Sequence, residues 1–435
     1  MKKKIKTFSH EYMCVPVLFL IFFAVLFLFS CTEKTNVKLG ASSLNQKENF
    51  EKPYLVLISL DGYRWDYTKR FQPPNILKFI EEGVEAESML PCFPSKTFPN
   101  HYSIATGMYP NNHKLVDNSF FNYEKNEVYR IRDREKVEDG TWYGGTPIWV
   151  QATNSGMVTA SYFFVGSEAD VQGVRPNYYY TYDGSVKNSE RVAQVLKWLK
   201  MPPKKRPHFI ATYFSDMDDI GHRAGPNNDA ELKAKILALD HDLGVLFSEI
   251  KKIGLPVNIM IVSDHGMYEI STEKYMPIEY VENEELFKAV NNGAIVHIYP
   301  NDSSEIDSVY NYLKNKEKNF KVYKTENTPQ FEIKIDNKDY GAIQIIPDVG
   351  WYFTSQRNIG FKKRMNIVNN GEHGLDPDLK EMHAIFYANG PAFKNNFKTK
   401  TVKNIHLYPI MCKILEIEIP ENIDGELKEL EHILK

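Results

Sequence analysis

Six side chains with the chemistry of metal ligands are spread widely along the sequence. They are carboxylates and imidazoles that follow apolar segments or lie in a glycine-bounded loop: Asp61, Asp218, His222, Asp264, His265 and His373. Carboxylates gathered in one place repel each other, so such a cluster needs a cation or raised pKa values. Aspartate and histidine without cysteine favour Zn²⁺, with Mn²⁺ and iron as alternatives. Six ligands divide into two three-ligand sites with open positions, and two metals about 4 Å apart can hold both oxygens of a phosphoryl transfer.

A candidate nucleophile is Thr97, in the segment 94–102 (PSKTFPNHY). Pro99 is suited to the first turn of a helix, which places Thr97 at the N-terminus of that helix. Free N–H groups and the helix dipole stabilise anions at this position. A metal ion bound to the Thr97 hydroxyl would favour the alkoxide without a separate protein base.

These residues need a scaffold that brings distant segments together. Apolar segments typical of buried strands alternate with amphipathic helical patterns, the strands at 54–60, 157–164, 209–214, 257–263 and 383–388 and the helices at 190–200 and 229–253. This alternation predicts an α/β fold with a mostly parallel central sheet and helices on both faces. Ligands bind at the carboxyl ends of the strands in such sheets, where Asp61, Asp218 and Asp264 stand. A mixed stretch at about 294–365 predicts a small inserted α+β subdomain.

The N-terminus has the features of an export signal. Lysines at positions 2, 3, 4 and 6 precede an apolar run of 15 residues, Val15–Phe29, which is shorter than the ~20 residues of a membrane-spanning helix. Leu28–Cys31 is similar to a bacterial lipoprotein cleavage box, so we expect a signal peptide over 1–31, lipidation of Cys31 and anchoring in the cell envelope. A plain signal peptide or an uncleaved anchor is the alternative. Residues 32–52 predict a flexible tether and 53–435 the catalytic domain.

Composition limits the remaining functions. The chain has 435 residues, 43% of them hydrophobic and 25% charged, with a formal charge of −3. A sizeable core is therefore expected, and binding to a nucleic-acid scaffold by phosphate attraction is not. Outside the leader only Cys92 and Cys412 remain, and they either pair or stay as buried thiols.

The longer motif around Thr97 resembles a known family. Segment 96–102 (KTFPNHY), followed by 106–110 (TGMYP), is similar to the nucleotide pyrophosphatase/phosphodiesterase family of the alkaline phosphatase superfamily. The resemblance covers about residues 53–393. Further matching pieces are 60–62 (LDG), 116–118 (VDN), 147–149 (PIW), 166–168 (GSE), 218–226 (DDIGHRAGP), 263–267 (SDHGM) and 373–374 (HG).

This resemblance implies roles for individual residues. Asp218, His222 and His373 would hold one zinc ion, and Asp61, Asp264 and His265 the other. Thr97 would bind the second zinc and attack phosphorus, giving a phosphothreonine intermediate. Asn118 would donate to a nonbridging phosphate oxygen, Phe98 and Tyr182 would sandwich a base, and Tyr213 would line the same pocket. The implied enzyme has two Zn²⁺ ions and releases nucleoside 5′-monophosphates from nucleotides.

Four other functions compete with this interpretation. A sulfatase is suggested by Cys92 in the segment 92–96 (CFPSK), but Thr106-Gly107 has the family spacing from Thr97 and lies five residues too far from Cys92. A phosphate monoesterase would need a cation for the extra charge, whereas Phe98 follows the nucleophile. A lipid-headgroup phosphodiesterase would need an aromatic cage for choline. A binding lipoprotein without catalysis would not need Thr97 or two metal sites.

Overall fold

The computed structural model describes residues 38–39 and 44–435. The predicted signal peptide and its lipidation residue Cys31 lie outside these residues. Within the described ranges, every helix is too short or too polar to cross a membrane.

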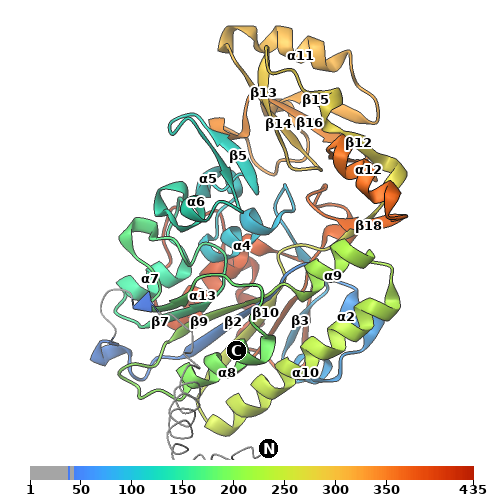
Figure 1. The fold of residues 1–435 in the computed structure, drawn as a ribbon. Coiled ribbons are helices and arrows are strands. Elements are labelled where there is room, and N and C mark those ends of the chain that lie inside the picture. The colour runs from blue at the N-terminus through green and yellow to red at the C-terminus, as the bar shows by residue number, and fades with distance from the viewer. Residues whose placement is uncertain (1–37, 40–43) are drawn as a thin grey trace, which may run out of the picture. The chain divides into compact units, whose positions relative to one another are not determined.

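A nine-stranded sheet forms the centre of the molecule (Figure 1). The strand order is β1-β8-β7-β9-β2-β10-β19-β3-β20, and the five strands from β8 to β10 run parallel. Strand β19 is antiparallel to both of its neighbours. The strands are β1 Lys38–Leu39, β2 Tyr54–Leu60, β3 Val84–Ala86, β7 Thr159–Tyr162, β8 Tyr178–Tyr180, β9 Phe209–Phe214, β10 Val257–Val262, β19 Phe386–Asn389 and β20 Phe397–Thr399. The predicted mostly parallel sheet is confirmed.

Alternation of side chains along the strands creates two cores. In β2, Leu55 and Leu57 point into one core while Val56 and Ile58 point into the other, as the two-residue period of a strand requires. Three helices cover the first face: α4 (Thr97–Thr106), α7 (Ile148–Asn154) and α13 (Leu407–Leu415). Three others cover the second face: α3 (Pro74–Glu81), α8 (Asn188–Leu199) and α10 (Asp229–Ile253). Helices on both faces are therefore also confirmed.

Short elements extend the strand ends that carry the site. Helix α9 (Asp216–Ala224) begins directly after β9, and α4 begins at Thr97. The other short helices and ribbons of this part are α2 Tyr67–Phe71, α5 Pro110–His113, α6 Arg134–Glu138, β4 Met89–Leu90 paired with β21 Val402–Lys403, and β5 Ser119–Asn122 paired with β6 Glu127–Arg130.

An inserted subdomain lies between β10 and β19 in the chain. Its sheet has the order β13-β14-β16-β15, all antiparallel, and carries its own apolar core. Figure 1 shows it beyond α4, apart from α8 and α10. Its elements are β13 Phe287–Asn291, β14 Val296–Pro300, α11 Ile306–Lys314, β15 Phe320–Lys324 and β16 Ile343–Pro347; β11 Tyr268–Ser271, β12 Tyr275–Pro277, β17 Tyr352–Thr354, α12 Gln356–Arg364 and β18 Asn369–Glu372 join it to the main sheet. The subdomain thus starts before residue 294, because β13 belongs to its sheet.

The flexible tether predicted over 32–52 is wrong for residues 44–52. Asn45 donates to the backbone oxygens of Pro203 and Arg206 and accepts from the N–H of Val158. Asn49 is buried and donates to the Ser155 oxygen. These polar contacts hold the segment against the α/β body, although its composition resembles a linker.

Candidate metal centre and active site

The structure brings the six predicted metal ligands together as two adjoining groups of three. Asp61, Asp264 and His265 form one group, and within it the potential ligand atoms all lie within 4.8 Å of one another. Asp218, His222 and His373 form the other, with the same limit. The imidazole rings of His265 and His373 stack with centroids 3.7 Å apart, so the two groups are in direct contact.

The first group stands at the ends of two neighbouring parallel strands. Asp61 follows β2, and Asp264 and His265 follow β10, which pairs with β2. All three side chains are buried. His265 Nε2 lies 3.0 Å from Asp264 Oδ2 and 3.5 Å from Asp61 Oδ1. The parallel pairing of β2 and β10 thus makes residues 200 positions apart into neighbours.

The second group takes two of its members from one helix and the third from the end of a strand. Asp218 and His222 lie one turn apart on α9, so they point the same way, and His222 Nε2 is 3.4 Å from Asp218 Oδ1. His373 follows β18 and brings its Nε2 to 3.7 Å from the same oxygen. Asp218 and His222 thus follow β9, as predicted, and the helical segment 216–224 gives them their common direction.

The polar atoms of both groups are arranged for cations. Each histidine has its Nδ1 within 2.8–3.0 Å of a backbone oxygen: His222 with Gly371, His265 with Gly266 and His373 with Ser95. Nδ1 therefore carries the proton, and the Nε2 lone pair faces the carboxylates. Among the described residues, none donates a hydrogen bond to three buried carboxylate oxygens that face these nitrogens: Asp61 Oδ1, Asp218 Oδ1 and Asp264 Oδ2. Unpartnered buried oxygens are costly in a protein, and a divalent cation in each group would satisfy them.

The carboxyl groups carry the electrostatic cost of this clustering. Burial raises the pKa of Asp61 well above its usual value, and the charges of Asp264 and Asp218 raise it further. Burial also raises the pKa of Asp218. Asp264 differs, because the imidazoles of His265 and His101 outweigh its burial and hold its pKa well below the usual range. Burial lowers the pKa of His373 and keeps that ring neutral, as a metal ligand must be.

Thr97 is the first residue of α4 and faces the first group. Its Oγ1 lies 3.3 Å from His265 Nε2. Pro99 occupies the first turn of this helix, as predicted. The hydroxyl thus lies beside the imidazole of the first group and at the positive end of a helix dipole.

Asn118 lies beside Thr97 with a free donor. Its Oδ1 accepts from the backbone N–H of Phe98 at 3.0 Å, which fixes the amide so that its NH₂ group points away from that contact. The Nδ2 atom makes no hydrogen bond among the described residues that the structure records. An amide held in this way can donate to an oxygen bound near Thr97.

The predicted substrate-binding aromatics have separate surroundings. Tyr182 is 41% exposed and packs edge-on against Phe163 and Tyr213, with centroids 5.2 and 6.1 Å apart. Phe98 is half-buried and lies 6.5 Å from the ring of Tyr129. The Tyr213 hydroxyl donates to Asp61 Oδ2 at 2.5 Å, so this residue orients a ligand carboxylate. The sandwich of Phe98 and Tyr182 around a base stays a prediction.

Two further buried side chains near the site, Lys96 and His101, were given no role from the sequence. Lys96 donates to the Tyr352 hydroxyl at 2.8 Å, and burial lowers the pKa of its ammonium. His101 accepts or donates at Ser59 Oγ, 2.6 Å away, and lies 3.3 Å from Asp264 Oδ2. Their positions next to Thr97 in the motif were the available signal, but their partners come from other segments.

The cysteines do not take part in this site. Cys92 and Cys412 are both free and buried. The Cys92 thiol donates to Asn404 Oδ1, and burial raises its pKa well above its usual value. A buried protonated thiol is a poor nucleophile, so the geometry does not favour the sulfatase interpretation.

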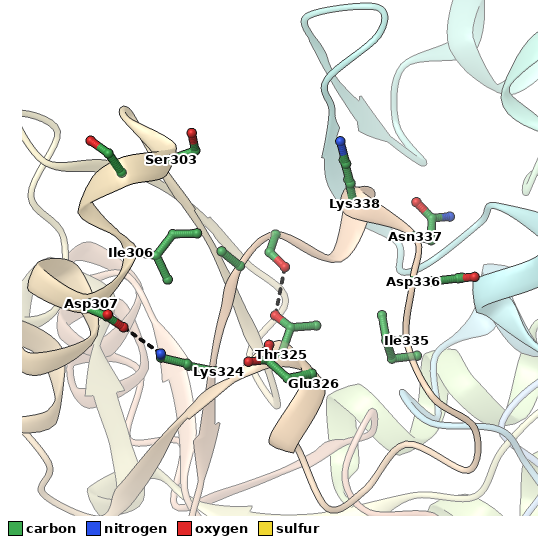
Figure 2. A pocket seen from close by; sticks show the side chains of 13 residues that line it. Ser303, Ile306, Asp307, Lys324, Thr325, Glu326, Ile335, Asp336, Asn337 and Lys338 are labelled. Carbon is green, nitrogen blue, oxygen red and sulfur yellow. Dashed lines mark hydrogen bonds and ion pairs between the residues drawn. The ribbon is translucent and has the colours of Figure 1, made fainter.

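A hollow of about 460 Å³ lies on the inserted subdomain (Figure 2). Its lining includes the ion pair of Lys324 with Asp307, at 2.5 Å, and Thr325. The 13 side chains drawn there include none of the predicted metal, catalytic or substrate-binding residues.

Comparison with known proteins gives consistent similarities. The family model for type I phosphodiesterases/nucleotide pyrophosphatases matches residues 55–376. A bis(5′-adenosyl)-triphosphatase of Xenopus laevis is 33% identical over 371 residues, covering 85% of this chain and 79% of the relative. Human ectonucleotide pyrophosphatase/phosphodiesterase family member 1 is 32% identical over 420 residues, covering 93% of this chain and 44% of the relative. A venom phosphodiesterase of Crotalus durissus collilineatus is 34% identical, covering 89% and 47%. The chain spans about half the length of the human and venom relatives.

Solved structures show the same likeness. Murine ectonucleotide pyrophosphatase/phosphodiesterase 5 is 28% identical with a TM-score of 0.80, covering 88% of this chain and 100% of the other. The same murine protein, as an inactive threonine-to-alanine variant in complex with AMP, is 29% identical with the same TM-score and coverage.

Proposed function

This chain belongs to the type I phosphodiesterase/nucleotide pyrophosphatase family, and we propose that it uses two zinc ions and a phosphothreonine intermediate to release nucleoside 5′-monophosphates. The family's enzymes hydrolyse phosphodiester and pyrophosphate bonds, and this chain is one of them. The observation that carries the finer proposal is the pair of three-ligand groups beside a hydroxyl at a helix N-terminus.

The two groups of side chains would each hold one zinc ion. Their donor set of three carboxylates and three imidazoles, without thiolates, suits Zn²⁺. When bound, the two ions would neutralise the phosphate charge and stabilise the oxygens that enter and leave. The protein side chains fix the positions of the ions through the backbone contacts of the histidines and the Tyr213 contact to Asp61.

Thr97 would attack phosphorus and become esterified. Its hydroxyl releases its proton to water, and the α4 N-terminus favours the negative charge on Oγ1. The bond from Oγ1 to phosphorus would form as the bond from phosphorus to the leaving-group oxygen breaks, so that the nucleoside phosphate stays on Thr97 and the leaving group departs. Water would then cleave the phosphothreonine, giving net retention at phosphorus. The inactive threonine-to-alanine variant of the murine relative supports a threonine in this role.

Asn118 and the aromatic residues would hold the substrate. The Asn118 NH₂ group would donate to a nonbridging oxygen whose charge grows in the transition state. Phe98 and the exposed Tyr182 would receive the base, and the AMP bound to the murine relative supports a nucleotide there. The aromatic group formed by Phe121, Tyr123 and Tyr299 is not a free choline cage, because Lys288 Nζ lies 3.5 Å from the centroid of the Phe121 ring.

A comparison of two chromogenic substrates tests this function. We expect zinc-loaded enzyme to hydrolyse nitrophenyl thymidine 5′-phosphate at least about 100-fold faster than nitrophenyl phosphate. The cation next to Thr97 in the chain, Lys96, donates to the Tyr352 hydroxyl, and Phe98 follows Thr97, so neither neighbour meets a monoester's extra charge. The measurement is kcat/KM on both, with ATP, a dinucleoside polyphosphate, NAD and a phosphocholine lipid as further substrates. A preference for the monoester would contradict the proposal, and selective turnover of the phosphocholine lipid would replace the nucleotide by a lipid headgroup.

We also propose that the enzyme is exported and anchored through a lipid on Cys31. The basic, apolar and cysteine-terminated leader supports this, as do relatives named as ectonucleotide and venom enzymes. Labelling of producing bacteria with a radioactive fatty acid should mark the full-length protein, and Cys31→Ala should lose the label and leave the membrane fraction. Equal labelling of the two proteins would contradict lipidation at this residue.

A further inference from the structure

A chain of buried polar side chains joins the inserted subdomain to the segment that carries Asn118. Asp117, His297 and Gln344 are all fully buried. Asp117 Oδ1 accepts from the backbone N–H of Asn118 at 2.6 Å, and its Oδ2 lies 3.0 Å from His297 Nε2. On the other side of the ring, His297 Nδ1 lies 2.8 Å from Gln344 Oε1. His297 is on β14 and Gln344 on β16, so both belong to the subdomain.

The outermost contacts determine which atoms of this chain carry protons. Gln344 Nε2 lies 2.5 Å from the Tyr340 backbone oxygen and 2.9 Å from Thr325 Oγ1. A backbone oxygen only accepts, so the amide nitrogen faces Tyr340 and the amide oxygen faces His297. Both nitrogens of the His297 ring are therefore engaged, Nε2 with the Asp117 carboxylate and Nδ1 with the Gln344 amide oxygen. His297 thus connects Gln344 of the subdomain to Asp117.

Stability alone does not account for these buried polar contacts. Replacing both partners of a buried hydrogen bond by apolar groups of the same shape can be nearly neutral, and the subdomain already has an apolar core of its own. The same segment is also fastened at Ser119, which exchanges two hydrogen bonds with Asn292, and at Phe121, whose N–H donates to the Tyr299 hydroxyl. What the contact between His297 and Asp117 adds is a directed hydrogen bond at the residue next to Asn118.

We propose that His297 is a positioning residue for the reaction, acting through Asp117 to fix the direction in which the Asn118 amide donates to the phosphate. The Asn118 backbone is held by Asp117 and its side-chain oxygen by Phe98, so the remaining NH₂ group has one orientation. Thr325, which accepts a hydrogen bond from Gln344 at the outer end of this chain of polar side chains, lines the hollow shown in Figure 2. The inference rests on the donor role of Asn118 in the function proposed above.

The test compares His297→Gln with a matched change in the same strand. We expect His297→Gln to lower kcat on nitrophenyl thymidine phosphate about tenfold or more with KM within roughly threefold, because a misplaced donor acts on the transition state. Tyr299→Phe removes a buried hydroxyl two residues away on β14, at the same interface, and should keep kcat within about twofold. Zinc content should equal that of the wild type in both variants.

The decisive measurement repeats His297→Gln in an Asn118→Ala background. If His297 acts through Asn118, the second substitution should cause no further fall in kcat, whereas a general structural defect would multiply the losses. Unchanged kcat in His297→Gln, or multiplied losses, would overturn the inference. If His297→Gln does not fold, Gln344→Met takes its place, with a smaller fall that must also vanish in the Asn118→Ala background. Full activity of Asn118→Ala would contradict the donor role proposed for Asn118. A slow Asn118→Ala together with a normal His297→Gln would leave that role intact and contradict only the positioning role of His297.

Discussion

Thr97→Ala should abolish turnover, lowering kcat roughly 10⁴-fold or more, because it removes the atom that would form the bond to phosphorus. The substitution leaves the six carboxylate and imidazole ligands in place, so zinc content should be unchanged. Thr97→Ser keeps a hydroxyl at the α4 N-terminus and should retain a measurable rate. The measurements are steady-state kcat on nitrophenyl thymidine phosphate and zinc content by atomic absorption.

The intermediate gives this prediction a second, independent readout. Acid quenching during turnover of a phosphorus-labelled diester should leave label on the wild-type chain and none on Thr97→Ala. Thr106→Ala is the matched control, since Thr106 lies in the last turn of the same helix and its hydroxyl donates to the Tyr102 oxygen. It should keep the label and the rate. Retention of a tenth or more of the activity by Thr97→Ala would show that another group attacks phosphorus.

The parts of the fold that follow local patterns were predictable from the sequence. Strands β2 and β9 were predicted with their observed bounds, because each is a continuous apolar run that is buried from both sides. Helix α10 also has its predicted bounds, since a long apolar stripe begins after the Asn228 cap and ends at Gly254. The six candidate metal ligands were predictable as a set because strand ends and a specific motif mark them, and the structure brings these side chains together in two groups of three.

The parts that depend on distant partners were not predictable. Helix α9 is short and polar, and it packs against β18, which lies about 150 positions further along the chain. Asn45 looks like a linker residue until its contacts with Pro203 and Arg206 are seen. No window of the sequence connects His297 to Asp117, which lies 180 positions away. A short segment of sequence shows its hydrophobic periodicity, and this predicts helices and strands. The contacts named here join residues far apart in the sequence and form only when the chain folds.

Asp218→Asn should lower zinc binding and activity, and it should also remove the destabilising effect of a buried charge in the metal-free protein. The amide keeps the shape of the side chain but removes one negative charge from the group with His222 and His373, so zinc content should fall by about one per chain. Loss of one of two ions removes several kcal/mol of transition-state stabilisation, which corresponds to a kcat/KM roughly 10³-fold lower. Asp219→Asn is the matched control and should keep both zinc and rate, since Asp219 is the next residue of α9 and its carboxylate accepts from the Ser215 hydroxyl.

The effect of Asp218→Asn on the melting temperature should have opposite signs in the metal-free and the zinc-loaded protein. Burial raises the pKa of Asp218 in the folded, metal-free protein, so this carboxyl favours folding while protonated, and that contribution is lost as the pH rises through its folded-state pKa. At neutral pH the uncharged amide avoids this penalty. Metal-free Asp218→Asn should therefore melt at the same or a higher temperature than metal-free wild type, and the difference should shrink as the pH is lowered. With zinc the order should reverse, because wild type binds one more ion to its folded state. A metal-free variant that melts below metal-free wild type at neutral pH would mean that Asp218 stabilises the fold without a cation, and the ligand assignment of this group would then fail.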